Sequence, residues 1–251
     1  MYPVIAEPFG FTISSFGVMV ALGFIAAALL TASSFEKAGL ERELAWNVLT
    51  WAIVGGIVGA KLWNVAEALA RGPETSLLKL FANRAGLTWY GGMIGAILLS
   101  AVGARRNGVP LKAGFDAAAA GAAIGQAIGR VGCFLVGDDY GKPTDVPWAV
   151  AFPEGQPPTL DPVHPTMLYE SAWLLLAGAW LWRRRNHSPF LFGEYLIAQG
   201  LGRLVIEHWR SNPPLVGPLT NAQVIALFCL LVGVAGWTYF ARRRPVVPST
   251  I

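Results

Sequence analysis

Seven long apolar segments, separated by connections that hold most of the charges, run through the 251-residue chain. An α-helix needs roughly 20 predominantly apolar residues to cross the hydrocarbon core of a bilayer, and these segments approach or reach that length. The segments are residues 11–32, 44–69, 88–104, 115–135, 167–182, 192–209 and 222–241. We therefore predict an all-α polytopic membrane protein with seven transmembrane helices.

The composition agrees with this fold class. Hydrophobic residues make up 54% of the chain and charged residues 14%, so the chain is more apolar and less charged than a soluble domain. The two cysteines, Cys133 and Cys229, are far apart in sequence, which indicates neither a disulfide framework nor a metal cluster. No positively charged region precedes the first apolar segment, so we expect a membrane span there and not a cleaved signal peptide.

The basic residues occur in short clusters between the apolar segments, a pattern that favours membrane topology signals over nucleic-acid binding. With the N-terminus outside, the inner connections and the C-terminal tail hold eleven of the 19 lysines and arginines, including the triplets at 183–185 and 242–244. Basic residues concentrate on the cytoplasmic side of membrane proteins. We therefore expect the N-terminus outside and the C-terminus in the cytoplasm.

The stretch at residues 125–141, GQAIGRVGCFLVGDDYG, joins a helix of small residues to an acidic loop bounded by glycines. Its arginine, Arg130, lies deep in the bilayer or at its edge, because the preceding residues are almost wholly apolar. An ionisable residue there is costly and marks a functional site with a partner to be found. The polar stretch that follows, about residues 136–165, is long enough to form a small outer subdomain.

Two arginines near the end of the sixth apolar segment reach the same predicted membrane level as Arg130. Arg203, Glu207 and Arg210 are spaced i, i+4 and i+7, so they share one face of a continuous helix. Guanidinium groups stay charged when desolvated and pair with phosphate oxygens through two hydrogen bonds. Two or three arginines with few acids in an apolar cavity therefore indicate a phosphate site, and a phospholipid headgroup is the expected anion.

A structural alternative stays open for the same residues. Arg203 and Glu207 can form an intramembrane ion pair, and Arg130 can pair with Asp138 or Asp139 across the loop. In that interpretation the charges hold helices together and bind no ligand.

Small residues at a four-residue spacing predict close helix contacts. They occur in the second apolar segment and on one face of the fourth, where such a face belongs against a helix or a ligand. Lys61, in the second segment, is interpreted either as a site residue or as a lysine whose ammonium group extends to the membrane boundary. The glycines are Gly55 and Gly59, and Gly121, Gly125 and Gly129.

Four blocks of sequence resemble one family. GRVGCFLVGDDYG at 129–141 resembles G-R-x-G-N-F-x-N-x-E-x-x-G, the signature of the bacterial prolipoprotein diacylglyceryl transferases. YGGMIG at 90–95 resembles the family's H-G-G-x-I-G, and PWAVAFP followed by VHPTMLYE at 163–170 resembles its outer loop and R-H-P-S-Q-L-Y-E. GRLVIEHWR at 202–210 resembles F-R-x-x-x-E-x-x-R. The blocks keep the family's order and span roughly residues 10–242.

The resemblance implies seven transmembrane helices in the bacterial inner membrane and an active site that opens to the outer leaflet. It also implies a reaction: the diacylglyceryl group of phosphatidylglycerol moves to the lipobox cysteine thiol of a preprolipoprotein, and glycerol phosphate is released. The partners are therefore this lipid, the lipobox and the bilayer, with no nucleic acid. No metal or cofactor is needed, since arginines can supply the countercharge for a leaving phosphate.

By resemblance, Arg130 and Arg203 are the best candidates for a phosphate clamp, with Glu207 orienting Arg203 and Tyr90 at the catalytic position before Gly-Gly. The thiol nucleophile comes from the substrate, so the chain needs no catalytic serine or cysteine of its own. Further substrate-binding candidates come from the same blocks and from the second segment. They are Cys133, Asp138, Gly141, His164, Tyr169, Arg210 and Lys61.

Several positions depart from the family pattern. Tyr90 replaces a histidine, and its unperturbed pKa of about 10, against about 6.5 for histidine, makes it a poor base at neutral pH. In an active transferase Tyr90, an acid of the loop or water would therefore do the work of that histidine. Phe16 stands where tyrosine is usual, Cys133 replaces an asparagine, Asp138 replaces a glutamate and Lys61 replaces an arginine. These differences indicate a divergent branch.

Two further functions are considered. A phospholipid-binding paralogue would keep the arginine clamp but lack the transfer chemistry or use another acceptor. A transporter is less favoured, because the sequence shows no repeated halves with broken helices. Among the histidines, His164 serves either as a base or to order its loop, His208 is a weaker base candidate, and His187 is expected to be solvated.

Overall fold

The computed structural model describes residues 2–8, 12–71 and 88–243. The chain divides into two compact units. The first unit comprises Met1–Thr31 and Phe115–Ile251, and the second comprises Ala32–Gly114. Every arginine and carboxylate of the predicted phosphate site belongs to the first unit.

In the described residues seven α-helices coincide with the seven apolar segments, together with one 3₁₀ turn and three short β-hairpins. The helices are α1 (Ser15–Lys37), α2 (Glu43–Arg71), α4 (Trp89–Arg106), α5 (Leu111–Val136), α6 (Thr166–Arg184), α7 (Leu191–Ile206) and α8 (Asn221–Arg242), and the turn η2 is Glu207–Trp209. The antiparallel hairpins pair β1 (Val4–Ala6) with β2 (Ile13–Ser14), β3 (Val150–Phe152) with β4 (Thr159–Val163), and β5 (Pro214–Val216) with β6 (Leu219–Thr220).

The structure adds one detail to the predicted all-α fold and corrects two. Three short β-hairpins accompany the helices: one precedes α1, one lies between α5 and α6, and one lies between α7 and α8. The first helix begins at Ser15, after a hairpin, although residue 11 itself lies outside the described residues. The sixth helix ends at Ile206, and the 3₁₀ turn that follows replaces its last predicted turn.

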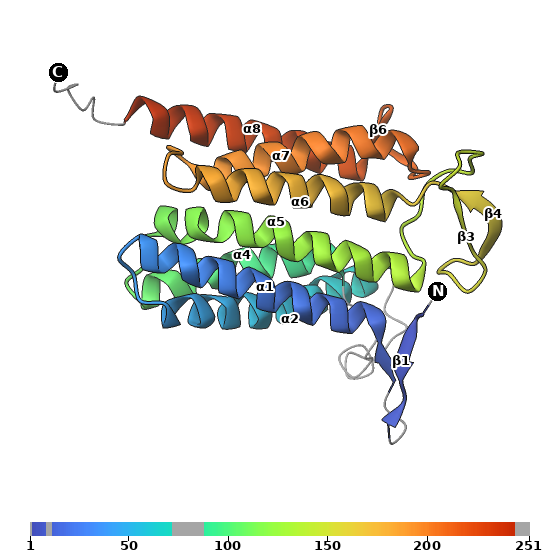
Figure 1. Cartoon of the computed structure of the whole chain (residues 1–251), viewed down its shortest axis with the longest axis horizontal. Helices are drawn as coiled ribbons and strands as arrows, with labels where there is room; N and C mark the ends of the chain where they lie inside the picture. Colours follow the sequence, from blue (N-terminus) through green and yellow to red (C-terminus); the bar gives the residue numbers. More distant parts are fainter. Residues whose placement is uncertain (1, 9–11, 72–87, 244–251) are drawn as a thin grey trace. The chain divides into compact units, whose positions relative to one another are not determined.

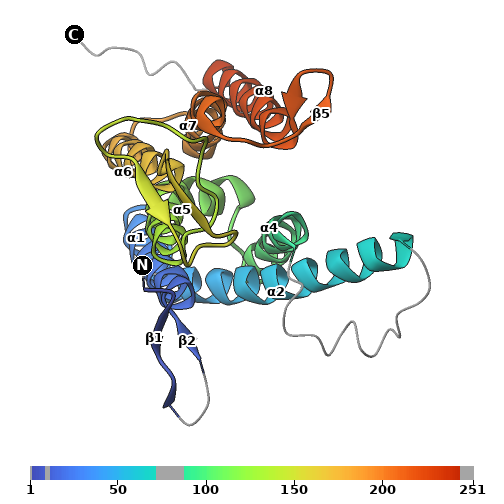
Figure 2. The same cartoon turned by 90° about the vertical axis from the view of Figure 1, so that its right-hand side faces the viewer.

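Within the first unit the helices lie side by side and the hairpins gather at one end of them (Figure 1). Figure 2 looks onto that end, with the β3–β4 hairpin beside the ends of α5 and α6. Phe152 and Val163 of this hairpin are buried against Cys133 at the end of α5 and Met167 at the start of α6. The hairpin end of the first unit therefore has its own small apolar core.

Glycines let the helices of the first unit approach closely, as the spacing predicts for Gly121 and Gly125. A Cβ atom on Gly125 would lie 2.7 Å from the carbonyl oxygen of Gly23 on α1, and one on Gly121 would lie 2.6 Å from that of Ala27. No larger residue fits at these two positions without moving α1. Gly129 differs, because an added Cβ would have nothing within 4 Å among the described residues.

Buried polar contacts hold α6, α7 and α8 together at the end opposite the hairpins. Both carboxylate oxygens of Glu194 on α7 accept hydrogen bonds from Arg184 on α6, at 2.7 and 2.8 Å. Oε1 also accepts from Trp237 on α8, at 3.0 Å, and from Ser188, at 2.8 Å. Hydrogen bonds inside an apolar bundle fix one arrangement of helices, because leaving any of these groups unpaired is costly.

In the second unit, α2 and α4 pack through glycines, which confirms the contact predicted for Gly55 and Gly59. A Cβ atom on Gly55 would lie 2.7 Å from Cβ of Leu99 and would meet the backbone of Gly95. One on Gly59 would lie 2.9 Å from Cα of Gly95.

The outer surfaces of several helices are apolar. In the described residues four helices, α1, α2, α5 and α8, are long and apolar enough to cross a membrane. Large hydrophobic side chains such as Leu22 and Ile25 on α1, Ile57 on α2, and Phe228 and Leu231 on α8 are exposed. Exposed apolar faces of this extent are expected to contact lipid. The structure is therefore that of a mostly helical, multi-pass membrane protein.

Candidate active site

Three arginines and three carboxylates from separate segments meet at the hairpin end of the first unit. Arg130 comes from α5, Asp139 from the loop after it, and Glu170 from the second turn of α6. Arg203 comes from the last turn of α7, Glu207 from η2, and Arg210 from the residue after η2. We call these six residues the arginine cluster.

Glu170 is the centre of the arginine cluster. Its Oε2 lies 2.5 Å from Nε of Arg130, and its Oε1 accepts a hydrogen bond from Nη1 of Arg203. Nη1 of Arg210 lies 3.7 Å from the same Oε1. The Glu170 side chain is only 8% exposed, so one buried carboxylate supplies countercharge to all three guanidinium groups.

Asp139 bridges two of the arginines from the solvent side. Its Oδ2 lies 2.7 Å from Nη1 of Arg130, and its Oδ1 lies 2.6 Å from Nη2 of Arg210. Burial raises the pKa of the Asp139 carboxyl, but the charges of Arg210 and Arg130 and their hydrogen bonds outweigh it and lower the pKa to about 2. Asp139 is therefore ionised throughout the physiological pH range.

Glu207 forms an ion pair with Arg203, as the i, i+4 spacing predicts. Its Oε2 lies 3.2 Å from Nη2 of Arg203. Its other oxygen accepts hydrogen bonds from Oγ1 of Thr220, at 2.6 Å, and from Nδ2 of Asn212, at 2.8 Å. The side chain is 1% exposed, so this carboxylate is fully enclosed by its partners.

The prediction that Arg210 shares a helix face with Arg203 and Glu207 is wrong. The backbone of Arg210 is extended, with φ −96° and ψ 156°, because the helix has already ended at Ile206. Arg210 nevertheless turns back toward the cluster, where its Nε lies 3.8 Å from Oε2 of Glu207. Arg210 therefore reaches the other two residues through a turn, whereas Arg203 and Glu207 keep the i, i+4 contact that helical periodicity predicts.

The prediction of few acids beside the arginines is also wrong, because Glu170 was missed. The cluster holds as many carboxylates as guanidinium groups. The ion pairs of the structural alternative are present, with Asp139 and not Asp138 as the loop partner of Arg130. The sequence could have indicated Glu170 as a site residue. It is the last residue of VHPTMLYE and lies near the start of an apolar segment, where a carboxylate is costly unless it has a partner.

Backbone contacts of the loop explain why residue 141 is glycine. Gly141 N–H donates to the carbonyl oxygen of His164, at 2.8 Å, and Lys142 N–H donates to that of Trp209, at 2.8 Å. A Cβ atom on Gly141 would meet the carbonyl oxygen of Trp209 and lie 2.7 Å from Cγ2 of Thr166. Gly141 thus allows the loop that carries Asp139 to lie against the segment that carries Arg210.

His164 and Tyr169 lie together beside the cluster. Nδ1 of His164 is 3.1 Å from the Tyr169 hydroxyl, which accepts a hydrogen bond from Nε1 of Trp148 at 2.7 Å. The ring of Trp209 packs near both, with centroid distances of 6.2 Å to His164 and 5.8 Å to Tyr169. These contacts join the outer loop, α6 and η2 into one wall of the site.

Cys133 lies in the last turn of α5, and Asp138 lies in the loop that follows. The Cys133 Sγ lies 3.8 Å from Nη1 of Arg130 and is otherwise buried among the apolar residues of the hairpin core. Burial raises the pKa of the Asp138 carboxyl above its ordinary value, with a hydrogen bond from Cys133 acting against it. Its Oδ1 is buried and has no hydrogen-bond partner among the described residues.

The other two predicted site residues belong to the second unit. Lys61 lies half-buried in α2, and Tyr90 lies in the first turn of α4. The Tyr90 side chain is outside the described part of the structure. The structure thus brings together every predicted site residue of the first unit and describes Lys61 only within its own unit.

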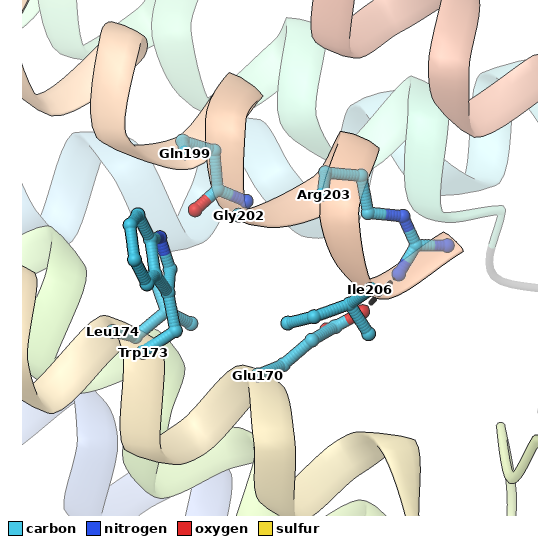
Figure 3. Close-up of a pocket in the computed structure, with 7 residues that line it drawn as sticks. All are labelled: Glu170, Trp173, Leu174, Gln199, Gly202, Arg203 and Ile206. Carbon is cyan, nitrogen blue, oxygen red and sulfur yellow. Dashed lines mark hydrogen bonds and ion pairs between the residues drawn. The ribbon is translucent and has the colours of Figure 1, made fainter. Parts of the chain in front are cut away.

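A small cleft between α6 and α7 is lined by two residues of the cluster, Glu170 and Arg203 (Figure 3). The Arg203 guanidinium points across this gap at the Glu170 carboxylate, and Trp173 and Gln199 line it farther along the helices. The free volume is about 10 Å³, enough for roughly one water molecule. In the described residues no group of three or more His, Cys, Asp or Glu side chains is arranged to hold a metal ion.

Nearly the whole chain is similar to known proteins of one family. The family model described as prolipoprotein diacylglyceryl transferase matches residues 3–239. A phosphatidylglycerol–prolipoprotein diacylglyceryl transferase of Clostridium tetani is 34% identical over 242 residues, which cover 93% of this chain and 96% of that protein. The protein of the same name from Gloeobacter violaceus is 35% identical over 255 residues, covering 96% of this chain and 93% of that protein. This chain therefore belongs to the prolipoprotein diacylglyceryl transferase family.

Proposed function

We propose that the chain transfers the diacylglyceryl group of phosphatidylglycerol to the lipobox cysteine thiol of a preprolipoprotein, the first step of lipoprotein maturation. The names of its relatives state both substrates. The observation that carries the proposal is the meeting of Arg130, Arg203 and Arg210 around one buried carboxylate at the end of an apolar bundle.

The reaction replaces a carbon–oxygen bond with a carbon–sulfur bond. The cysteine sulfur attacks the carbon of the diacylglyceryl group that is bonded to the phosphate oxygen, and the electron pair of the broken C–O bond leaves with glycerol phosphate. The thiol proton passes to a base or to the departing phosphate. The protein has two tasks: to help form the thiolate and to stabilise the negative charge that grows on the leaving group.

The arginines suit the second task. Arginine stays protonated even when buried, and its planar donors match phosphate oxygens. We assign Arg130 and Arg203 to the leaving phosphate, with Arg210 as a further phosphate ligand and Glu207 holding Arg203 in place. Removing one such preorganised donor typically costs about a hundredfold to a thousandfold in rate.

The remaining roles rest on the family pattern and on the contacts described above. Tyr90 stands at the position of the family's histidine and is assigned to the catalytic group. The wall of His164 and Tyr169, and the loop held by Gly141, are assigned to substrate binding. Cys133, whose Sγ lies 3.8 Å from Nη1 of Arg130, and Asp138 are assigned to substrate binding, and Lys61 is assigned to the lipid site by its place in the pattern.

The proposed topology has seven spans in one transferase domain, residues 1–251, with the N-terminus outside and the C-terminus in the cytoplasm. Seven spans are supported because all seven apolar segments are helical in the described residues. Of these helices, α4, α6 and α7 are shorter or less apolar than the other four. The loop at about 136–165 then forms the outer subdomain. The proposed location is the bacterial inner membrane, without cofactor or nucleic acid.

A second candidate is a phospholipid-binding paralogue that lacks this transfer chemistry. One observation favours it: a tyrosine replaces the family's histidine, so the group expected to take the thiol proton is absent. Such a protein would bind the same lipid phosphate and release no glycerol phosphate.

Complementation separates the two candidates. The chain is expressed in a bacterium depleted of its own transferase, and a lipobox protein is analysed for diacylglyceryl-cysteine. We expect growth and modification with the wild-type chain and with Arg42→Ala, an exposed arginine remote from the cluster in sequence, and neither with Arg130→Ala. Good membrane expression without modification would reject the transferase and favour the paralogue.

A further inference from the structure

We propose that Asp139 occupies the lipid-phosphate position of the free protein and that the phosphodiester of the bound lipid displaces it. The inference rests on the proposed function and deepens it, because it names what the lipid must replace. The family signature does not specify the residue at position 139. The occupation of the phosphate position by an aspartate is therefore a feature of this chain's own sequence.

The Asp139 carboxylate is placed as a phosphate would be. It gives one oxygen to Arg130 on α5 and the other to Arg210 after η2, at 2.7 and 2.6 Å. Two oxygens of one anion thereby bridge two guanidinium groups from separate segments. Arginine pairs bind phosphate through the same bridging contacts.

Within the part of the chain that the structure describes, two N–H donor atoms of the Arg210 guanidinium group make no hydrogen bond. Its side chain is 5% exposed, yet its buried Nε and Nη1 have no hydrogen-bond partner among the described residues, and their nearest carboxylate oxygens lie 3.8 and 3.7 Å away. Buried donors without partners are costly. A phosphate has more oxygens than a carboxylate and can reach donors that Asp139 leaves unused.

Asp139 is the one of the cluster's three carboxylates that can leave at the lowest cost. Its side chain is 46% exposed, against 8% for Glu170 and 1% for Glu207. Glu170 and Glu207 are enclosed, so moving either would leave buried arginines without countercharge. Asp139 can instead rotate into solvent and regain hydration.

The charges also favour an exchange. Three guanidinium groups and the carboxylates of Glu170 and Glu207 leave one positive charge in the cluster, which Asp139 neutralises. A phosphodiester carries a single negative charge at neutral pH. Replacing Asp139 by the lipid phosphate therefore keeps the cluster neutral, and since Asp139 stays ionised at neutral pH, the exchange is a displacement and not a protonation.

The backbone can stay in place during this exchange. Asp139 has φ +60°, a left-handed conformation that costs a non-glycine residue free energy, and its carbonyl oxygen accepts a hydrogen bond from Thr166 at 2.8 Å. The loop is thus held through its main chain. Rotation about the side-chain bonds of Asp139 is enough to open the two arginines.

The test is equilibrium binding to the purified full-length chain in detergent micelles. The ligands are dioctanoyl-phosphatidylglycerol, glycerol 1-phosphate as a phosphate without acyl chains, and dioctanoylglycerol as a lipid without phosphate. The variants are Asp139→Asn, which keeps the side chain's shape, and Asp139→Gly, which suits the positive φ and protects against a folding failure. The matched control is Asp145→Asn, an exposed aspartate of the same loop.

We expect both Asp139 variants to bind dioctanoyl-phosphatidylglycerol and glycerol 1-phosphate about three to ten times more tightly, the size expected for one competing ion pair. Dioctanoylglycerol binding and the Asp145→Asn control should not change. Equal or weaker phosphate binding by folded Asp139 variants, or equal tightening for dioctanoylglycerol, would overturn the inference. Failure of the proposed function looks different: the wild-type chain would then bind phosphatidylglycerol no better than dioctanoylglycerol, or bind it without transferring its diacylglyceryl group.

Discussion

The Glu170 carboxylate on α6 lies 2.5 Å from Nε of Arg130 on α5, and its other oxygen is bonded to Arg203 on α7. One buried side chain thus sets the spacing of the two arginines assigned to the leaving phosphate. The arginines owe their arrangement to an acid that does not itself need to touch the lipid.

Glu170→Gln tests this positioning role. The amide keeps the size of the side chain but removes the countercharge, and leaving a buried charge unpaired costs about 3–5 kcal/mol. We expect the kcat/KM for phosphatidylglycerol to fall at least about a hundredfold, with the KM for a lipobox peptide little changed. Steady-state kinetics with both substrates measures this split, and Glu154→Gln in the exposed loop is the control. Unchanged lipid kinetics in folded Glu170→Gln would contradict the role.

Gly141→Ala tests whether the close backbone contacts of Gly141 fix the position of the loop that carries Asp139. The added methyl group would collide with the carbonyl oxygen of Trp209 and with Thr166, so the loop must move away from the segment that carries Arg210. We expect the unfolding temperature and the transfer rate both to fall. Thermal unfolding in detergent and the transfer assay measure these changes.

Gly129→Ala is the matched comparison for stability. The added methyl group has nothing within 4 Å among the described residues, and alanine favours a helix over glycine by about 1 kcal/mol. Its unfolding temperature should stay the same or rise. Equal losses of stability in the two variants would show that the Gly141 contacts are not what fixes the loop.

Much of the fold follows from sequence because its causes are local. Each run of apolar residues became a helix, and the four-residue spacing of Gly55 and Gly59, and of Gly121 and Gly125, became close helix contacts. The Arg203–Glu207 contact was also predictable, since it depends only on the i, i+4 spacing at the end of one helix.

The rest of the site could not be predicted because its contacts join distant segments. Glu170 meets Arg130, Arg203 and Arg210 through the packing of α5, α6 and α7, and no sequence spacing encodes those meetings. The choice of Asp139 over Asp138 as the partner of Arg130 depends on a left-handed backbone at residue 139. That conformation is set by the loop's tertiary contacts, including the bond from Thr166.

The pH dependence of the unfolding temperature should reveal how much the buried, ionised Asp138 carboxylate destabilises the folded protein. Burial raises its pKa in the folded state, so its ionised form opposes folding, and its contribution becomes less favourable as pH rises through that pKa. Asp138→Asn should therefore unfold at a higher temperature than wild type at pH 7, and the difference should shrink toward pH 4. Asp139 contributes in the opposite sense, since its lowered pKa supports folding above about pH 4 and that support is lost toward pH 2.

Unfolding temperatures at several pH values measure the effect, with Asp145→Asn as the control for removal of an exposed carboxylate. A lower unfolding temperature for Asp138→Asn at pH 7 would show that the charged form is stabilised in the folded protein, against this account.

Tyr90→His tests the departure from the family's histidine. A histidine with a pKa of about 6.5 can accept a proton near neutral pH, whereas tyrosine at about 10 cannot do so readily. If Tyr90 only takes the histidine's place, Tyr90→His should raise the transfer rate and introduce a rise in rate near pH 6–7. The pH–rate profile of both proteins measures this. A variant that loses activity would indicate that the site has been rebuilt around the tyrosine hydroxyl, and Tyr90→Phe would then lose activity as well.

The most direct measurement of the central claim uses the purified chain, phosphatidylglycerol and a synthetic peptide with a lipobox cysteine. Mass spectrometry follows the peptide, and an enzymatic assay follows glycerol phosphate. The account predicts a peptide that gains one diacylglyceryl group on its cysteine, one glycerol phosphate released for each peptide modified, and neither product with Arg130→Ala. Lipid binding by the wild-type chain with neither product formed would contradict it.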